Sequence, residues 1–323
     1  SNMSSHSSYK EFLRKWAPLM VLLLLCTIIS VIYPGFLSVR NFSRLLTASA
    51  APLMIAIGVT FIIIMGSIDL SIEGIMAFCG SMLAIIMVKL GGFSELGYLA
   101  IPAAILISAA CGLINGLIHV TLKIPSFLVS LGIGFSLIGV TMVITGGERI
   151  PLPDRTFRLL LTERIFDFPL MVYLAGAALL CAWFIQRYTA LGRNFYAVGG
   201  GEHLAYASGL SVKRIRVLGF ALAGVFYGLG AVFAVARLGS VASNLGDGYT
   251  FIAITSVVVG GTSLMGGNGG VWQSLIGVLI INVINNGMVL VGFPTYIQQG
   301  VLGALVIISV ALVTNRKRLQ IVK

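Results

Sequence analysis

The sequence predicts an all-α integral membrane protein with about ten transmembrane helices. Its residues are 58% apolar and only 10% charged, whereas a typical soluble domain has about 25% charged residues. The apolar residues form long runs, among them Leu19–Ile32, Leu99–Val120 and Val301–Val313. A helix needs about 20 such residues to cross about 30 Å of hydrocarbon. The runs do not alternate as barrel strands would, so helices are the spanning structure.

Ten spans account for the apolar runs. We expect them over residues 16–33, 46–66, 71–90, 97–120, 126–145, 168–186, 214–237, 250–265, 271–291 and 297–314. Residues 16–314 then form one membrane domain, between an N-terminal segment over 1–15 and a tail over 315–323. Ser1 and Asn2, ahead of Met3, are expected to remain from cloning. The first run is not expected to be a cleaved signal peptide, because it lacks a small-residue cleavage site.

Basic residues orient the spans. They gather in the N-terminal segment, in the loop between the sixth and seventh spans, and in the tail. They are Lys10, Arg14, Lys15, Arg187, Arg193, Lys213, Arg214, Arg216, Arg316, Lys317, Arg318 and Lys323. An even number of spans puts all three groups on one side, which the positive-inside rule makes the cytoplasm. Both termini of this inner-membrane protein are therefore expected in the cytoplasm, although Arg40 and Arg44 fall on the opposite side.

The net charge of +11 does not predict a nucleic-acid partner. The positive residues lie at the ends of spans and form no basic amphipathic stripe, which is the usual mark of a nucleic-acid-binding domain. We interpret them as determinants of topology.

A weak internal repeat indicates two related halves. Asn115-Gly116 precedes Ile124-Pro125-Ser126-Phe127 and a span, and Asn286-Gly287 precedes Phe293-Pro294-Thr295-Tyr296 and a span. Spans two to five then match spans seven to ten. Because the offset of five is odd, the two copies face opposite ways, as in the inverted repeats of many transporters. Chance similarity remains the alternative.

The first motif is Gly66-Ser67-Ile68-Asp69-Leu70-Ser71, between two apolar spans. Asp69 and Ser71 are suited to cap the next helix, since its first amides favour an acidic group. Glu73 follows in the first turn of that helix. A proton relay is the alternative, because carboxylates near the membrane are costly and often functional. A relay needs a second buried titratable partner, and the sequence of the nearby spans offers none.

The second motif is the glycine-rich run Gly260–Gly270. No Lys-Ser/Thr pair follows it, so it is not a nucleotide-binding P-loop. Small residues let helix backbones approach closely in a membrane. We therefore expect a structural hinge here, with a ligand cradle as the alternative. The motif residues concerned are Gly260, Gly261, Thr262, Ser263, Gly266 and Gly267.

The third motif is the loop over residues 187–213, which is longer than a simple connection between two spans requires. It reads as one short helix around Arg193–Val198, a glycine break, and a second helix around Glu202–Ala207. Its aromatic and small residues carry few charges, which indicates a docking surface. A helix lying on the lipid surface is the alternative, but these elements are too short and too weakly basic for it.

No enzymatic constellation accompanies these motifs. The sequence has no nucleophile–base–orienter set, no metal-ligand spacing and no Walker A sequence. We expect that the chain is not an enzyme, holds no metal or cofactor, and takes its energy from a partner or an ion gradient.

The three motifs together resemble the ribose-type permeases of bacterial ABC importers, in the branched-chain amino acid/ribose permease superfamily. The matching segments are Ile68–Ser71, Thr189–Gly200 and Gly260–Gly269, in that order. The resemblance covers about Pro34 to Thr314. It implies a type II importer fold that carries a sugar or a sugar-like solute. It also implies a permease homodimer, two cytoplasmic ATPase subunits that bind ATP and Mg, and a periplasmic solute-binding protein.

The resemblance also assigns roles to residues. The segment 189–209 is implied to couple to the ATPase, and the outer loop over 146–168 to meet the binding protein. The coupling residues would be Thr189, Gly192, Arg193, Ala197, Gly199, Gly200, Glu202, Ala205 and Gly209. The sequence departs from the family pattern in two places. Glu73 stands where a small residue is usual, and Gly201 where an asparagine is usual.

The mechanism we expect is alternating access, along a path lined by polar residues. The candidates are Asn115, Asn282, Asn285, Asn286, Thr295, Tyr296, Gln298 and Gln299. Interhelical hydrogen bonds explain each of them equally well. The rival is an ion-coupled secondary transporter without an ATPase, which predicts a charged residue at the membrane midplane. Asp69, Glu73 and Asp247 all fall near the ends of the expected spans, and a membrane scaffold is a more distant third alternative.

Overall fold

The computed structural model describes residues 2–313, so Ser1 and the expected tail over 315–323 lie outside the described residues. Ten apolar α-helices dominate the described part, which confirms an all-α membrane protein with about ten spans. They are α1 (Asn2–Ile32), α2 (Val39–Ile64), α3 (Ile72–Lys89), α4 (Ala100–Leu122), α5 (Ser126–Thr145), α7 (Leu170–Tyr188), α10 (Val212–Leu238), α11 (Tyr249–Val259), α12 (Val271–Val291) and α13 (Thr295–Val313). Eight of the ten are long and apolar enough to cross a membrane. The exceptions are α11 and α13, whose apolar stretch is Thr295–Ala311.

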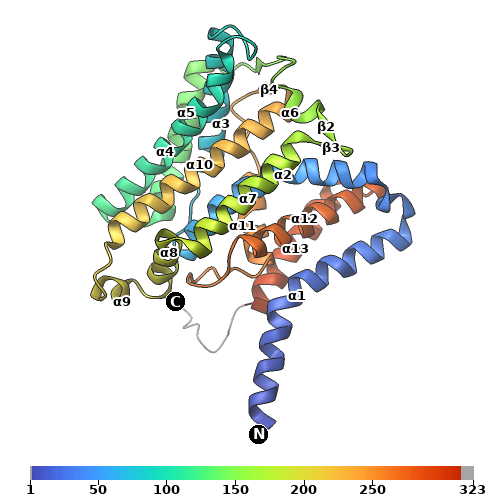
Figure 1. Cartoon of the computed structure of the whole chain (residues 1–323), viewed down its shortest axis with the longest axis vertical. Coiled ribbons are helices and arrows are strands. Elements are labelled where there is room, and N and C mark those ends of the chain that lie inside the picture. Colours follow the sequence, from blue (N-terminus) through green and yellow to red (C-terminus); the bar gives the residue numbers. More distant parts are fainter. Residues whose placement is uncertain (1, 314–323) are drawn as a thin grey trace.

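Short elements connect these helices at the two ends of the bundle (Figure 1). One end carries α8 (Ala190–Gly200) and α9 (Glu202–Ala207), and we call it the α8 end. The other end carries four two-residue strands and α6 (Leu159–Thr162), and we call it the strand end. There β1 (Ile150–Pro151) pairs with β4 (Ser240–Val241), and β2 (Arg164–Ile165) with β3 (Phe168–Pro169), both antiparallel. The remaining connections are the 3-10 helices η1 (Pro34–Leu37) and η2 (Gly97–Leu99).

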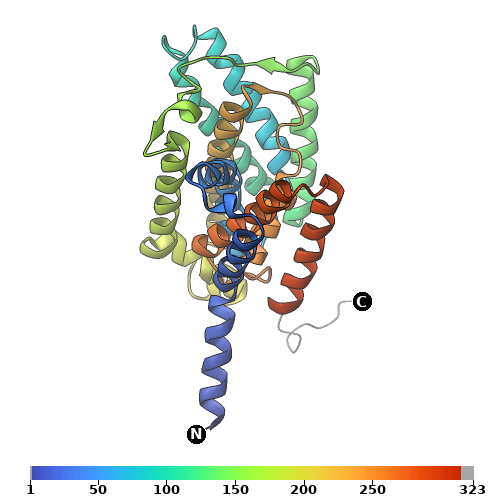
Figure 2. The ribbon, with the colours of Figure 1, turned by 90° about the vertical axis from the view of Figure 1, so that its right-hand side faces the viewer.

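Helix α1 lies at the periphery, and its first turns project beyond the bundle at the α8 end (Figures 1 and 2). The helix begins at Asn2 rather than at residue 16. From Asn2 on, the predicted N-terminal segment is therefore helical and continuous with the first span. Its contact with the bundle is on α12, where a Cβ on Gly287 would meet the Ile29 side chain.

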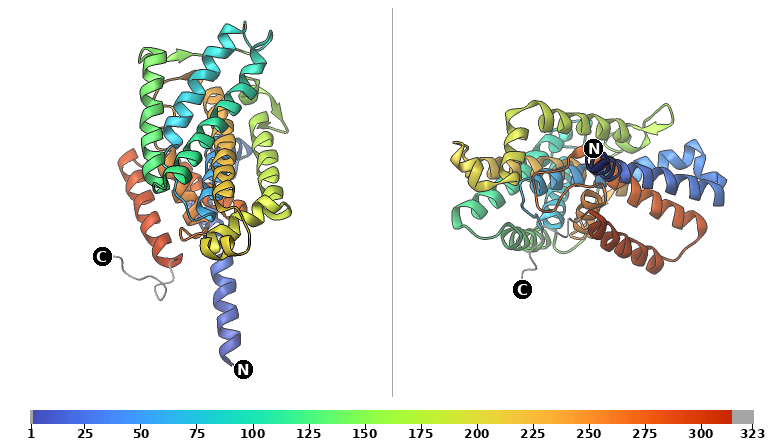
Figure 3. Two further views of the ribbon diagram at one scale, coloured as in Figure 1. Left: turned by 90° about the vertical axis from the view of Figure 1, so that its left-hand side faces the viewer. Right: turned by 90° about the horizontal axis from the view of Figure 1, so that it is seen from below.

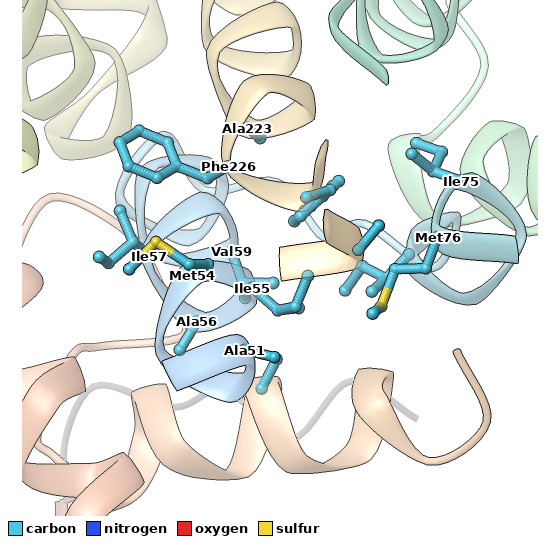
Figure 4. Close-up of a cluster of buried hydrophobic side chains, with 14 of the residues drawn as sticks. Ala51, Met54, Ile55, Ala56, Ile57, Val59, Ile75, Met76, Ala223 and Phe226 are labelled. Atoms are coloured by element: carbon cyan, nitrogen blue, oxygen red, sulfur yellow. The ribbon is translucent and has the colours of Figure 1, made fainter. Parts of the chain in front are cut away.

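The core is built around α2 and α10. Every residue of α2 from Ser49 to Ile64 is buried, as expected of a helix that is apolar on all sides. Figure 4 shows Met54, Ile55 and Phe226 in this cluster. Helix α10 also packs closely on α4, because Gly224 leaves room for the backbone around Ser108, whose hydroxyl donates to the Gly224 carbonyl at 2.5 Å.

The packing of the first half recurs in the second. Helix α10 packs on α4 as α2 packs on α12, and α3 packs on α5 as α11 packs on α13. The two central helices run in opposite directions, because α2 ends at the α8 end and α10 begins there (Figure 1). These relationships agree with the predicted inverted repeat of helices two to five and seven to ten.

The predicted span over 250–265 is wrong in its second part, because α11 ends at Val259 and the glycine run follows as a loop. Eleven residues extend about 17 Å, roughly half the hydrocarbon thickness. The chain therefore turns back from the strand end over residues 239–248 before α11 starts. Helix α3 likewise follows a non-helical segment, residues 65–71. Two repeat-related helices thus start next to interrupted backbone, as in many transporters.

Helices α5 and α13 lie along one side of the bundle and α7 along the opposite one (Figures 2 and 3). Large apolar residues are exposed on these helices of both sides, including Phe135 and Val143 of α5, Ile307 of α13, and Leu180 and Phe184 of α7.

Candidate coupling site

The three sequence motifs, far apart in the chain, meet at the α8 end. The Gly267 amide donates to the Ile64 carbonyl at 2.8 Å, which joins the glycine run to the end of α2. A Cβ on Gly266 would lie 2.9 Å from the Gly66 nitrogen and 3.1 Å from the Gly199 oxygen. Gly66, Gly199, Gly266 and Gly267 therefore form one backbone junction, which we call the glycine junction.

Glycine is required at this junction by space and by conformation. A Cβ on Gly199 would overlap the Ile64 carbonyl oxygen. Gly266 and Gly267 have φ of 89° and 76°, a region that side chains disfavour. Protein backbone fills the space between the motifs. The arrangement favours the structural hinge over the ligand cradle.

The rest of the glycine run is held by its own polar side chains and by α12. The Thr262 hydroxyl accepts from the Gly270 amide at 3.2 Å, and the Ser263 amide donates to the Asn268 carbonyl at 3.0 Å. A Cβ on Gly260 would overlap the Gln273 carbonyl, so α11 and α12 touch backbone to backbone. Gly261 lies in the turn that follows α11, with φ of 104°.

The corner between α7 and α8 is fixed by capping. Thr189 is the N-cap of α8, and its hydroxyl accepts from the Gly192 amide at 3.2 Å. Gly192 is buried, and a Cβ there would overlap the Ile185 carbonyl. Gln186 ties the corner to α12, because its Oε1 accepts from the Val271 amide at 2.8 Å. Sequence reasoning missed Gln186, since nothing in the pattern pairs it with a helix 85 residues away.

Two aromatic residues of α8 anchor it to the bundle. Phe195 is buried against Phe61 of α2, with ring centroids 5.7 Å apart. The Tyr196 hydroxyl donates to the Gly269 carbonyl at 2.5 Å. Burial raises the pKa of Tyr196 to about 12, so the phenol stays a neutral donor. The sequence indicated aromatic character in this loop but did not single out Tyr196.

The opposite faces of α8 and α9 are uncovered. Arg193, Ala197 and Gly200 are exposed on α8, whereas Ala205 of α9 is buried against the bundle. Leu204 and Tyr206 of α9 are each 72% exposed. We call the exposed residues Arg193, Ala197, Gly200, Leu204 and Tyr206 the α8–α9 surface. Such apolar and aromatic side chains outside a bundle are typical of a protein interface.

An ion pair joins α9 to the bundle. Arg216 of α10 lies 3.2 Å from the Glu202 carboxylate and also donates to the Ser67 hydroxyl at 2.6 Å. Gly201 is the N-cap of α9 and, being glycine, has no side chain to cap the helix. The turn after α9 ends at Gly209, where φ is 90°.

Asp69 lies in the core beneath this site. Its carboxylate is 2% exposed and accepts from the Ser71 amide at 2.9 Å and from the Tyr227 hydroxyl at 3.0 Å. Asn115 of α4 approaches the same carboxylate at 3.4 Å. Asp69 thus ties the 65–71 segment to α10 and α4, while Ser71, the N-cap of α3, makes no side-chain cap. The sequence offered no buried titratable partner, and the structure adds Tyr227.

Glu73 joins the two repeat-related helices. Its carboxylate accepts from the amide of Gly248, the N-cap of α11, at 3.0 Å. A carboxylate is favourable there because the first amides of a helix are unpaired and its N-terminus is electropositive. Asp247, next in the chain, is exposed.

The predicted path residues divide into two groups. Asn282 donates to Ser49 at 3.0 Å, and Asn286 and Asn41 exchange hydrogen bonds at 2.9 and 3.0 Å, so they link α12 to α2. Asn285 keeps a buried Oδ1 without a partner in the described structure. The residues at the start of α13 are the more exposed group, Thr295, Tyr296, Gln298 and Gln299, although the Gln298 amide donates to the Phe293 carbonyl at 3.1 Å.

The loop over 146–168 is folded at the strand end. Asp154 accepts from the Phe93 amide at 2.8 Å and from the Phe157 amide at 3.0 Å. Among the described residues, no group of three metal-ligating side chains occurs there or elsewhere.

Residues 41–310 match the family model described as branched-chain amino acid transport system / permease component. The ribose import permease protein RbsC of Escherichia coli (strain K12) is 34% identical over 313 residues, 96% of each chain.

Two further relatives are named as permeases for other sugars. The D-allose transport system permease protein AlsC of Escherichia coli (strain K12) is 32% identical, over 94% of this chain and 93% of its own. The galactose/methyl galactoside import permease protein MglC of Haemophilus influenzae (strain ATCC 51907 / DSM 11121 / KW20 / Rd) is 35% identical, over 96% and 97%. No solved structure matches the chain. The chain belongs to the permease-component family of branched-chain amino acid transport systems and is similar to ribose-type ABC permeases.

Proposed function

We propose that this chain is the transmembrane permease subunit of an ABC importer for a sugar or sugar-like solute. The observation that carries the proposal is the α8–α9 surface, an uncovered face on two helices that the bundle holds rigidly. It would seat in a groove of a cytoplasmic ATPase subunit. The solute class follows from the relatives, whose names specify ribose, allose and galactose.

The α8 end is the cytoplasmic end in this proposal. Lys213, Arg214 and Arg216 lie at the start of α10 on that side, as the positive-inside rule requires. Both termini are then cytoplasmic in the inner membrane. ATP and Mg bind to the partner ATPase and not to this chain, and a periplasmic solute-binding protein delivers the solute at the strand end.

A second copy of the chain completes the path. Helices α5 and α13 lie on one side of the bundle (Figure 2), and their exposed apolar residues, such as Phe135 and Ile307, would pack against an identical copy. Thr295, Tyr296 and Gln299 at the start of α13 are exposed as well. The homodimer would place the path between the copies, with these residues along it.

Alternating access would start at the glycine junction. A push on α8 reaches the end of α2 through Gly199 and the glycine run through Gly267. Each of these segments leads directly into a helix, namely α3 after residues 65–71 and α12 after Gly270. Because the backbones are in direct contact at the junction, the segments cannot shift independently of one another. ATPase closure would therefore move α3 and α12 together.

The test is reconstitution with partners. Proteoliposomes are prepared with and without the candidate ATPase and binding protein, and uptake of labelled ribose, allose and galactose is measured with and without ATP. Uptake only with ATP and both partners supports the importer. Uptake by the chain alone, driven by an ion gradient, refutes it and supports a secondary transporter, the candidate favoured by the buried Asp69–Tyr227 pair.

The α8–α9 surface is tested with Arg193→Glu, because Arg193 is exposed and the change leaves the packing intact. Association with the ATPase should be lost, whereas Arg40→Glu at the strand end should retain it. Normal association of Arg193→Glu would refute the role of this surface. Gly192→Glu is a poorer test, since Gly192 packs against the backbone of α7.

A further inference from the structure

A basic cavity lies at the strand end, away from the three sequence motifs, and two of its lining residues, Thr162 and Arg164, belong to the outer loop over 146–168. It opens to the surface and is lined by the first turns of α2, the last turn of α10, α6 and the β2–β3 hairpin, and its volume is about 480 Å³. Its polar lining consists of three arginines and three hydroxyl residues and includes no acidic residue. These residues are Arg44, Arg164, Arg237, Ser43, Thr47 and Thr162.

The three arginines keep free donors. Each of them is exposed, and Arg164 donates to the Ser43 hydroxyl at 3.3 Å and to the Asp167 carbonyl at 3.1 Å. Within the part of the chain that the structure describes, the only ion pair joins Arg216 and Glu202 at the other end. A guanidinium has five donors, so most of those around the cavity have no protein acceptor.

Nearby acids do not neutralise the cavity. Glu163 and Asp167 flank Arg164 along the hairpin, but neither lines the cavity. Three positive groups around one small space repel each other unless an anion separates them. Arginine binds phosphate oxygens through paired hydrogen bonds, and serine and threonine hydroxyls supply further donors. The volume falls within the range of small-ligand sites.

The cavity lies at the edge of the bundle that is suited to face lipid. The hairpin stands over the start of α7, on the side opposite α5 and α13 (Figure 2). At its tip Phe166 is 88% exposed, and Ile165 is 40% exposed. The Tyr173 hydroxyl donates to the Ile165 carbonyl at 2.5 Å and ties the hairpin to α7. Exposed apolar side chains beside arginines are suited to the boundary between acyl chains and headgroups.

We propose that this cavity binds the phosphate of an anionic phospholipid headgroup, with Arg44, Arg164 and Arg237 around the phosphate and Phe166 among the upper acyl-chain atoms. The site also explains why Arg44 departs from the positive-inside rule. The positive charge of Arg44 would pair with a lipid phosphate in the adjacent leaflet, so this charge does not determine the topology. The proposal is independent of the solute that the permease carries.

The test measures lipid binding to the purified full chain by native mass spectrometry, with phosphatidylglycerol as the probe and phosphatidylcholine for comparison. The cavity variant is Arg44→Gln/Arg164→Gln. Its matched control, Arg40→Gln/Arg155→Gln, removes two exposed charges at the same end that do not line the cavity. We expect the cavity variant to lose about tenfold in affinity for phosphatidylglycerol, as for the loss of a charge-assisted contact, and the control to bind like the original chain.

A second arm adds inorganic phosphate as a competitor. No release of the lipid at millimolar phosphate would support the lipid as the occupant, whereas release would assign the site to a soluble phosphate and overturn the lipid proposal. Equal affinity of the cavity variant and the control would overturn the proposal. The proposal would also be overturned if the cavity variant bound the lipid normally but no longer bound the solute-binding protein. That result would identify the cavity as a protein-docking surface.

Discussion

The Glu73 carboxylate accepts a hydrogen bond from the Gly248 amide at 3.0 Å, so the first turn of α3 holds the N-terminus of α11. These helices correspond in the two halves of the repeat, and each begins after a non-helical segment. The Glu73 carboxylate therefore makes a direct link between the two halves.

We predict that Glu73→Ala destabilises the chain by about 1 kcal/mol, the cost of losing a helix N-cap. Glu73→Gln should lose less stability, because the glutamine amide oxygen can still accept a hydrogen bond from the Gly248 amide. Thermal unfolding of the purified permease measures both. Glu148→Gln, at an exposed acid of the strand end, is the control and should match the original chain. Equal stability of Glu73→Ala and this control would contradict the link.

The glycine junction gives a sharper pair of variants. Gly199→Ala places a methyl group against the Ile64 carbonyl and should cost about 1–3 kcal/mol, as overpacking does. Gly176→Ala, in α7, is the matched control, since a Cβ there meets nothing within 4 Å. Stability is measured by unfolding, and coupling by ATP-dependent uptake. We expect loss of both in Gly199→Ala and of neither in Gly176→Ala. Normal stability and uptake of Gly199→Ala would mean that the backbones at the glycine junction are not tightly packed.

Tyr196→Phe should release the glycine run from α8. The variant keeps the ring and removes the donor to the Gly269 carbonyl, so we expect a loss of about 1 kcal/mol. Faster amide hydrogen exchange over residues 260–270 is the specific measurement. Because the pKa of Tyr196 is raised to about 12, exchange protection in the original chain should show no titration of this phenol below about pH 11. Tyr188→Phe, at a 56% exposed tyrosine, should leave the protection unchanged.

Hydropathy was enough to place most of the helices. The expected span over 71–90 became α3 at Ile72–Lys89, because a long apolar run has one way to satisfy its backbone in lipid. The span over 250–265 failed at its end, since hydropathy does not register that glycines 260 and 261 end a helix. Periodicity also gave no sign that α11 starts partway through the bundle.

The candidate site was predictable in its segments but not in its contacts. The loop with two short helices appeared as expected, as α8 and α9. That the loop meets Gly66 and Gly267 was not predictable, because contacts between distant segments depend on three-dimensional packing. The same reason explains why Gln186, Tyr196 and Tyr227 were missed. Each looks like an ordinary polar residue in an apolar helix until its partner is known.

Tyr227→Phe tests the buried carboxylate. The change keeps the ring that packs against Gly58 and removes the hydroxyl 3.0 Å from Asp69. Loss of a donor to a buried acceptor should cost about 1–3 kcal/mol. Tyr98→Phe, at a 48% exposed tyrosine, is the control and should cost nothing measurable.

The function of this pair is separated from its stability by a double-mutant cycle of Tyr227→Phe with Asp69→Asn. A structural contact predicts a coupling energy of about 0.5–3 kcal/mol in unfolding. It also predicts that Asp69→Asn retains ATP-dependent uptake, because the amide oxygen can still accept from the Ser71 amide while the amide nitrogen donates to the Tyr227 hydroxyl oxygen. A proton-coupled transporter predicts the reverse, namely that Asp69→Asn abolishes uptake in a protein that folds normally, since an amide cannot carry the proton. Uptake by Asp69→Asn therefore decides between the importer and its rival at the residue on which they differ.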